Sequence, residues 1–136
     1  MNSDEKRWPG PVFTVNLRLW IGGGRSIFFG PGRAELLDAI ESHGSLRKAA
    51  HELNMSYRGA WGKIKRTEEA LGFKLVDKTA SKKEGYRLTE AGRELKENYD
   101  RWVKEVQNDA IEKARTIFSL GAIRIEGKSS KKTSGK

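Results

Sequence analysis

Apolar and polar residues along the chain follow two different periods, and the change of period divides it into segments. Every second residue from Phe13 to Ile21 is apolar, and the residues between them are polar apart from Trp20. This alternation is the pattern of a half-buried strand. The glycines at 22–24 predict a turn, and the short apolar run at 26–29 completes a β-hairpin. A helical period replaces the alternation after Gly30, so the hairpin precedes a helical region.

Three short helices are predicted between Pro31 and Gly72. The first begins at Pro31, in the first turn where a missing N–H does no harm, and ends at Gly44. Ser45 and Ser56 are suitable N-caps for the second and third helices. The second helix has an apolar face at i, i+3, i+4 and i+7: Leu46, Ala49, Ala50 and Leu53. The buried side of the third is expected to hold Tyr57, Ala60, Trp61, Ile64 and Leu71, although Tyr57 fits an outward position equally well.

Two short strands and a long helix are predicted in the remainder of the chain. The strands at 73–76 and 86–88 flank a polar segment and form a β-wing. Thr89 caps a helix whose apolar residues recur every three or four positions as far as Ile117. A stripe this long exceeds what a small core needs, so it predicts a dimer seam; the alternative is packing on the hairpin of its own chain. The seam is expected to contain Leu95, Tyr99, Trp102, Val106, Ala110 and Ile117.

The segment from Gly44 to Gly72 has the sequence shape of a helix-turn-helix. Two amphipathic helices flank the short turn at 54–56, and the second helix of such a motif enters the major groove of DNA. The net charge of +9 is concentrated here and at the C-terminus. Residues 45–93 hold twelve Lys or Arg and six Asp or Glu, and residues 119–136 hold five and one. A localised positive field indicates a polyanionic partner, so we expect double-stranded DNA.

Hairpin, three helices, wing and long helix together predict a winged helix-turn-helix, an α+β fold that is mainly α-helical. The runs at 30–50, 55–64 and 87–95 resemble the N-terminal DNA-binding domain of molybdate-dependent transcriptional regulators of the ModE type. The segments Ser-Tyr-Arg-Gly-Ala-Trp at 56–61 and Leu-Thr-Glu-Ala-Gly at 88–92 are specific in combination. The same outline is similar, more distantly, to LysR-type regulators. The resemblance implies sequence-specific DNA binding and transcriptional regulation by a homodimer on an inverted repeat.

The expected organisation is a flexible N-terminus at 1–11, the DNA-binding domain at 12–118 with its dimerisation helix at about 89–118, and a disordered basic tail at 119–136. Members of the ModE family carry C-terminal molybdate-binding modules, for which a chain of 136 residues has no room. Their wing is rich in glycine, whereas this wing has one glycine and two lysines. We therefore expect neither molybdate binding nor a cofactor in this chain, while the resemblance itself points to molybdenum- or oxyanion-related gene control.

The resemblance assigns DNA contacts to the outward side of the third helix, the start of the second and the wing. An early recognition-helix arginine such as Arg58 reaches guanine O6 and N7. Two glycines on the same side weaken a helix by roughly 1 kcal/mol each relative to Ala, which suggests a close approach by DNA. The expected set is Arg47, Lys48, Ser56, Tyr57, Arg58, Gly59, Gly62, Lys63, Lys65, Arg66, Lys82 and Lys83.

Catalytic and metal chemistry find no support in the composition. The chain has no cysteine and two histidines, His43 and His51, without partners at metal-ligand spacing. Glu68 and Glu69 are adjacent carboxylates, but neighbours on a helix point about 100° apart, and we interpret both as solvated surface. No apolar run is long enough to cross a membrane and no signal peptide is recognisable, so we expect a cytoplasmic protein that is not an enzyme.

Two other functions are compatible with the same pattern. A non-specific architectural DNA-binding protein would also use a basic helix and a lysine-rich tail. A winged-helix module that binds protein belongs to a different class, and the basic third helix and wing argue against it. The ratio of the affinities for a selected site and for random DNA separates these alternatives.

Overall fold

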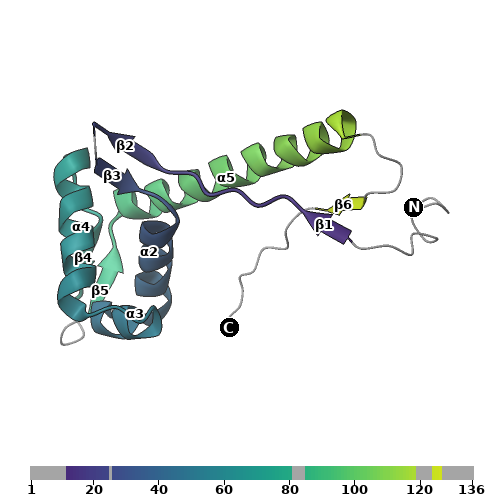
Figure 1. Ribbon diagram of the computed structural model, residues 1–136. Helices are drawn as coiled ribbons and strands as arrows, with labels where there is room; N and C mark the ends of the chain where they lie inside the picture. Colours follow the sequence, from purple (N-terminus) through teal and green to yellow (C-terminus); the bar gives the residue numbers. More distant parts are fainter. Residues whose placement is uncertain (1–11, 25, 81–84, 119–123, 127–136) are drawn as a thin grey trace. The chain divides into compact units, whose positions relative to one another are not determined.

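A computed structural model describes residues 12–24, 26–80, 85–118 and 124–126 of the chain (Figure 1). These residues fall into two compact units, one spanning 18–101 and one formed by the described residues before 18 and from 102 onward. The long helix α5 (Glu90–Ile117) contributes residues to both units. The larger unit holds the predicted helix-turn-helix and wing.

The larger unit is a winged helix-turn-helix, as predicted. Strands β2 (Ile21–Gly23) and β3 (Ser26–Phe29) form an antiparallel hairpin, which is followed by the helices α2 (Pro31–His43), α3 (Leu46–Glu52) and α4 (Tyr57–Leu71). Strands β4 (Val76–Lys78) and β5 (Tyr86–Leu88) pair in antiparallel register and form the wing, and the first part of α5 completes the unit. The fold is α+β and mainly helical.

The ends of the helices lie where the sequence predicted them. Gly44 and Gly72 end α2 and α4 with φ of 65° and 86°, a left-handed backbone that glycine adopts without strain. The Ser45 Oγ accepts a hydrogen bond from the Lys48 amide at 3.1 Å, and the Ser56 Oγ accepts one from the Gly59 amide at 2.9 Å. Each serine thereby satisfies one of the N–H groups that a helix leaves unpaired at its start.

The core is the meeting point of the apolar faces of α2, α3 and α4. Its largest fully buried side chains come from the hairpin, the three helices and the wing: Phe29, Leu36, Leu37, Ile40, Leu46, Ile64, Leu75 and Val76. Ala49, Ala50 and Ala60 are also buried. Their small side chains allow α3 and α4 to approach closely, so three short helices share one compact core.

A backbone hydrogen bond anchors the wing on the helices. The Tyr86 amide donates to the Gly44 carbonyl at 3.1 Å, which joins β5 to the connection between α2 and α3.

We predicted the first wing strand at 73–76, whereas β4 begins at Val76 and Phe73 is exposed. The strand begins later because the Leu75 amide donates to the buried Glu68 carboxylate at 2.7 Å and is not available to a neighbouring strand.

The single long strand predicted from Phe13 to Ile21 is wrong. Regular pairing is present at β1 (Val12–Thr14) and again from Ile21, while residues 15–20 have no strand. Side chains of α5 take over backbone groups there: in the smaller unit the Gln107 Nε2 donates to the Val15 carbonyl at 3.1 Å, and in the larger the Tyr99 hydroxyl donates to the Leu19 carbonyl at 2.7 Å. The alternation of exposed and half-buried residues persists without a strand.

The smaller unit contains a pairing that the composition did not predict. Strand β1 lies parallel to β6 (Arg124–Glu126), inside the segment that we expected to be disordered. A parallel ladder forms through backbone groups, and a composition rich in Lys, Ser and Gly carries no sign of it. The predicted flexible N-terminus at 1–11 and the rest of the tail lie outside the described residues.

Charged side chains join α5 to α2 within the larger unit. The Lys96 Nζ lies 3.3 Å from the Asp38 carboxylate, 3.8 Å from that of Glu41 and 3.6 Å from that of Asp100. Burial by itself would lower the pKa of Lys96, but these three carboxylates outweigh it and raise the pKa. The Arg93 Nε pairs with Glu41 at 3.0 Å, so both cations near the start of α5 hold it to α2.

Tyr99 attaches the same helix to the hairpin. Its ring meets that of Phe29 edge to face, with centroids 5.2 Å apart. Burial, together with the Asp100 charge, raises the pKa of Tyr99, against an opposing effect of Arg18. The hydroxyl therefore remains a donor to Leu19 over the whole neutral range.

The start of α5 packs so closely on the wing that only glycine fits at position 92. A Cβ built on Gly92 would overlap the Leu75 carbonyl oxygen, which already accepts a hydrogen bond from the Thr89 amide at 2.9 Å. The obstacle is backbone, which cannot rotate away as a flexible side chain would. Gly92 therefore sets the distance between α5 and the wing.

We expect Gly92→Ala to destabilise the domain by about 1–3 kcal/mol, the cost of overpacking a site that cannot relax. Gly32→Ala is the matched control, because nothing lies near a Cβ at that helical position and the change should stabilise by about 0.5–1 kcal/mol. Urea denaturation followed by circular dichroism measures both. Equal stabilities for the two variants would show that the Gly92 contact is not tight.

Candidate nucleic-acid interface

Helix α4 is held from behind by two polar side chains as well as by apolar packing. The Thr67 hydroxyl is buried and donates to the Phe28 carbonyl of β3 at 2.9 Å, while the Lys63 carbonyl of its own helix lies at the same distance and shares the hydrogen. The bond to Phe28 fixes the rotation of α4 against the hairpin. Ala60 and Ile64 are buried on the same side, as predicted.

Glu68 is the second of these side chains, and our interpretation of it as solvated surface is wrong. It is 8% exposed, and its Oε2 accepts from the Leu75 amide at 2.7 Å and from the Val76 amide at 3.4 Å. The charge is stabilised where the chain leaves α4 for the wing, because backbone N–H groups and Lys65, 3.6 Å away, point at it. Glu69, its neighbour in sequence, is exposed as predicted.

The side of α4 that faces away from the core is basic. Arg58 and Arg66 are exposed and Lys63 is half-buried, and there is no acidic residue from Tyr57 to Thr67. With the opposite side fixed by the core, these cations face solvent from a rigid helix. The structure therefore brings together the predicted side-chain set on α4, apart from Lys65.

Lys65 lies at the edge of that side and already has partners in the protein. Its ammonium group pairs with Glu68 and lies 5.2 Å from the centre of the Trp61 ring. Trp61, which we assigned to the core, is half-buried, with its ring 5.8 Å from that of Tyr86 in the wing. Trp61 thus joins α4 to the wing, and Lys65 contacts residues of its own helix.

The two glycines of α4 have different surroundings. A Cβ on Gly59 would lie 3.0 Å from the Ser56 Oγ, the oxygen that caps the helix. The serine cap therefore explains the glycine at position 59 without any contact to DNA. A Cβ on Gly62 would lie 3.3 Å from the Arg66 Nη1, the end of a flexible side chain, so Gly62 leaves room for the Arg66 guanidinium beside the helix.

Arg33 of α2 adds a cation that the sequence analysis missed. Burial, and after it the positive charge of Arg66, lowers the pKa of Arg33. The Arg66 charge acts on Arg33, so the two guanidinium groups repel each other. No short motif in the sequence announces such a pair, because the two residues come from helices far apart in the chain.

The start of the second helix places Arg47 and Lys48 in exposed positions, as predicted. Tyr57, which we could assign either inward or outward, is 37% exposed and lies outward. The Arg47 Cζ is 4.4 Å from the centre of the Tyr57 ring. Lys82 and Lys83 of the wing lie outside the described residues, whereas Lys78 and Arg87 on its two strands are described and exposed.

Comparison with known proteins agrees with this geometry. Residues 32–93 match the family described as bacterial regulatory helix-turn-helix protein, lysR family. The match begins in α2 and ends in the first turn of α5, so it covers the helix-turn-helix and the wing. Residues 32–93 are therefore similar to a LysR-type helix-turn-helix domain. A comparison with curated protein sequences gave no match.

Solved structures share the fold of this part of the chain. The chain is similar to a DNA-binding domain of CbnR in a complex with DNA, at 22% identity and a TM-score of 0.50, over 64% of this chain and 95% of that one. It is similar to full-length CbnR with its target DNA at 14% identity and a TM-score of 0.50, over 74% of this chain. The similarity spans 43% of full-length CbnR, so it concerns the fold of one part of that protein.

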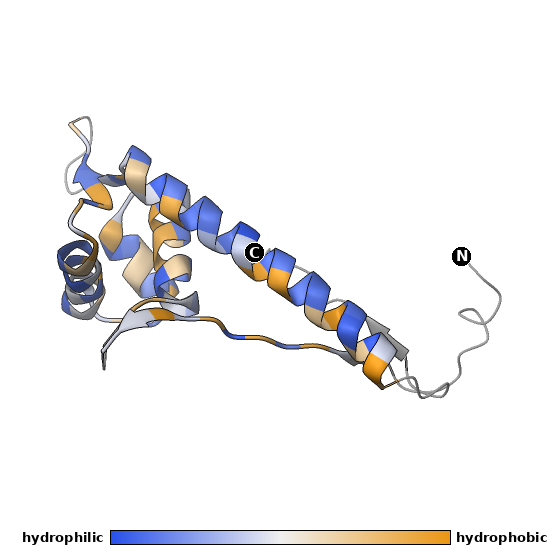
Figure 2. Cartoon of the chain, turned by 90° about the horizontal axis from the view of Figure 1, so that it is seen from above, coloured by the Kyte–Doolittle hydropathy of each residue, from blue (hydrophilic) through white to orange (hydrophobic). Residues whose placement is uncertain are grey.

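The apolar stripe of α5 continues beyond the matched residues 32–93, and its residues lie in different surroundings. Trp102 and Ile117 are 38% and 71% exposed, and Phe118 just after the helix is 58% exposed. Leu95, Val106 and Ala110 are half-buried. Tyr99 packs on the hairpin of its own chain, the alternative we had considered for the whole stripe. Figure 2 shows the hydrophobic positions recurring along α5 between hydrophilic ones.

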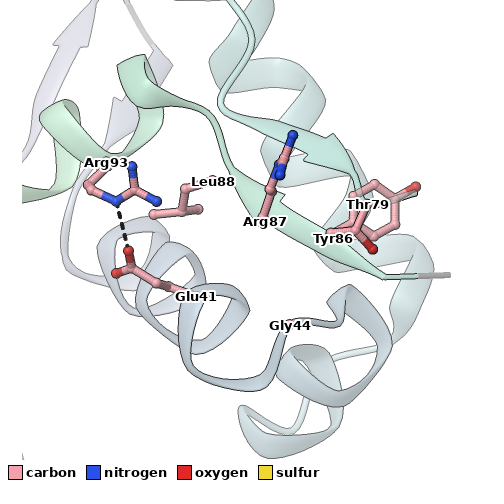
Figure 3. Close-up of a pocket in the computed structure, with 7 residues that line it drawn as sticks. All are labelled: Glu41, Gly44, Thr79, Tyr86, Arg87, Leu88 and Arg93. Atoms are coloured by element: carbon pink, nitrogen blue, oxygen red, sulfur yellow. Dashed lines mark hydrogen bonds and ion pairs between the residues drawn. The ribbon is translucent and has the colours of Figure 1, made fainter. Parts of the chain in front are cut away.

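A pocket of about 320 Å³ lies between α2, the wing and the start of α5 (Figure 3). Its charged residues are Glu41 and Arg93, which pair with each other, and Arg87, which is exposed on β5. The remaining lining residues are Gly44, Thr79, Tyr86 and Leu88. This set contains no residue pair arranged as a nucleophile and its base.

The described residues contain no helix with both the length and the apolar character needed to span a membrane. Within the same residues, no group of three or more His, Cys, Asp or Glu side chains is arranged to hold a metal ion.

We expect Glu68→Ala to destabilise the domain by about 1.5–3 kcal/mol, because two buried amides lose a charged acceptor. Glu69→Ala removes an exposed carboxylate of the same helix and should change stability by no more than about 0.5 kcal/mol. Thermal and urea denaturation of both variants measure the difference. Equal effects would mean that the Glu68 contacts contribute nothing specific.

Proposed function

We propose that this protein is a sequence-specific DNA-binding transcriptional regulator that lays α4 in the major groove. The observation that carries the proposal is the two-sidedness of α4: Thr67 and Glu68 fix one side, while Arg58, Lys63 and Arg66 occupy the other. A helix held rigidly by its core presents its cations to DNA without a further ordering cost.

The similarity of residues 32–93 to the lysR-family helix-turn-helix supports the same function. The similar CbnR domain is described in a complex with DNA, and full-length CbnR with its target DNA. At 22% and 14% identity these structures support the fold, and DNA binding by this chain is our inference from the fold together with its own basic surface. The matched family model describes a helix-turn-helix and names neither a ligand nor an effector. The proposal therefore includes no molybdate response.

The exposed cations have two roles in this proposal. Arg58, in the first turn of α4, is the candidate for a base contact, since an arginine there reaches guanine O6 and N7 together. Lys63 and Arg66, with Arg47 and Lys48 of α3, neutralise phosphates. Ser56 caps α4 and lies beside Arg58 at the start of the helix. Lys65 contributes to the positive field through a side chain that is 47% exposed.

The proposal includes a homodimer formed along α5. A Trp that is 38% exposed, followed by two exposed apolar residues at the end of the helix, is costly for a monomer to leave in water. Pairing of two such helices would bury Trp102, Val106 and Ala110 and leave Tyr99 with its own hairpin. Two copies of α4 would then meet the half-sites of an inverted repeat.

Selection of bound duplexes from a random DNA pool, at near-physiological salt, tests the function directly. Enrichment of an inverted repeat supports a dimeric, sequence-specific regulator. Retention without enrichment would favour an architectural DNA-binding protein. No retention would contradict DNA binding and favour a protein-binding module.

Arg58→Ala should weaken binding to the selected site by about 1–3 kcal/mol and change binding to random DNA little. Arg58→Lys is the matched variant, because it keeps the charge and loses the bidentate geometry. Fluorescence anisotropy on both DNAs measures the two losses. Equal losses on the selected and random DNA would make Arg58 a phosphate contact.

Trp102→Glu should produce monomers, because a charge in the seam would have to be buried without a partner. Lys104→Glu is the control, since Lys104 is an exposed residue of the same helix outside the predicted seam. Sedimentation equilibrium gives the mass of each species. Dimers of Trp102→Glu as stable as those of the parent would place the seam elsewhere.

A further inference from the structure

Arg47 and Tyr57 form a contact that spans the turn of the helix-turn-helix. Arg47 is the second residue of α3 and Tyr57 is the first residue of α4. The Arg47 Cζ lies 4.4 Å from the centre of the Tyr57 ring, well inside the range of a cation–π interaction. Both side chains are exposed, so the pair lies on the surface at the start of the recognition helix.

The helix termini and the sequence neighbours around Arg47 disfavour a cation. It occupies the first turn of α3, where the helix dipole is positive, and neither α3 nor α4 has an acidic residue in its first turn. Lys48 and Arg58, next to the pair in sequence, add like charge. The negative face of the Tyr57 ring offsets part of this repulsion, by about two- to fivefold in the population of the stacked state.

We propose that Tyr57 is a positioning residue that holds the Arg47 guanidinium toward a DNA phosphate, so that the two side chains bind DNA as one unit. The inference rests on the proposed DNA-binding function. An aromatic ring covers one face of a guanidinium, while the N–H donors lie in the plane and remain available at its edge. The first helix of a helix-turn-helix crosses the DNA backbone, and this favours a phosphate over a base as the partner of Arg47.

A double-mutant cycle on DNA binding tests the unit. The variants are Arg47→Ala, Tyr57→Leu and the double variant, each titrated with the selected duplex by fluorescence anisotropy at several salt concentrations. Each single change should weaken binding by about three- to tenfold and lower the salt slope by about one, the loss of one phosphate contact. The double variant should bind no more weakly than Arg47→Ala alone, because Tyr57 acts through Arg47.

Two controls separate positioning from other roles of Tyr57. Tyr57→Phe keeps the ring and should bind within twofold of the parent. Lys48→Ala removes an exposed cation of the same helix that lacks a contact with Tyr57 among the described residues. The fold-loss in DNA affinity of a Lys48→Ala/Tyr57→Leu double variant should therefore equal the product of the two single losses. Unchanged far-UV circular dichroism and melting midpoints establish that every variant is folded.

The free protein offers a readout that a purely structural role would not move. The ring current of Tyr57 shifts the NMR signals of the Arg47 side chain, and this shift should persist in Tyr57→Phe and vanish in Tyr57→Leu.

The outcomes that overturn the inference differ from those that overturn the function. Losses for Arg47→Ala and Tyr57→Leu that simply multiply would show independent contacts, and a full loss in Tyr57→Phe would make the hydroxyl itself the contact. Either result refutes the positioning role while DNA binding stands. A parent protein that binds no duplex, whatever the salt, refutes both.

Discussion

The hydrogen bonds that fix the core-facing side of α4 are the constraint on which the rest of this structure depends. A hydroxyl and a carboxylate, those of Thr67 and Glu68, leave the solvated state and bond to backbone groups of the hairpin and of the chain leading into the wing. Buried polar groups are costly unless they are satisfied, so these bonds form only when hairpin, helix and wing are all in place. They specify one rotation of α4, and with it the side that meets solvent.

The basic surface follows from that rotation. Arg58, Lys63 and Arg66 face outward because Ala60 and Ile64 face inward, and the absence of acidic residues between Tyr57 and Thr67 leaves their field uncompensated. Charge alone makes a surface attractive to any polyanion. A rigid arrangement of that charge distinguishes a sequence-specific DNA-binding protein from a non-specific one, because directional hydrogen bonds to base edges require fixed donors.

Local features of the fold were predictable from single residues. Ser45 and Ser56 begin helices, and Gly44 and Gly72 end them, for reasons that act within one turn of the chain. The wing strand was misplaced, and the strand from Phe13 to Ile21 was overextended, for the opposite reason. In both places a helix side chain takes the backbone group that a neighbouring strand would have needed.

The sequence by itself determined the helix-turn-helix, the wing, the long helix and the residues that could meet DNA, since periodicity, caps and clustered charge are local quantities. Only the tertiary structure decided which side chains are buried and bonded to other parts of the protein. Glu68 and Tyr99 have the same local signals as exposed residues of their helices, yet both are buried, and Glu68 binds the chain that leads into the wing while Tyr99 packs on the hairpin. The stack of Arg47 on Tyr57 likewise exists only because two helices cross, a relation that no local pattern encodes.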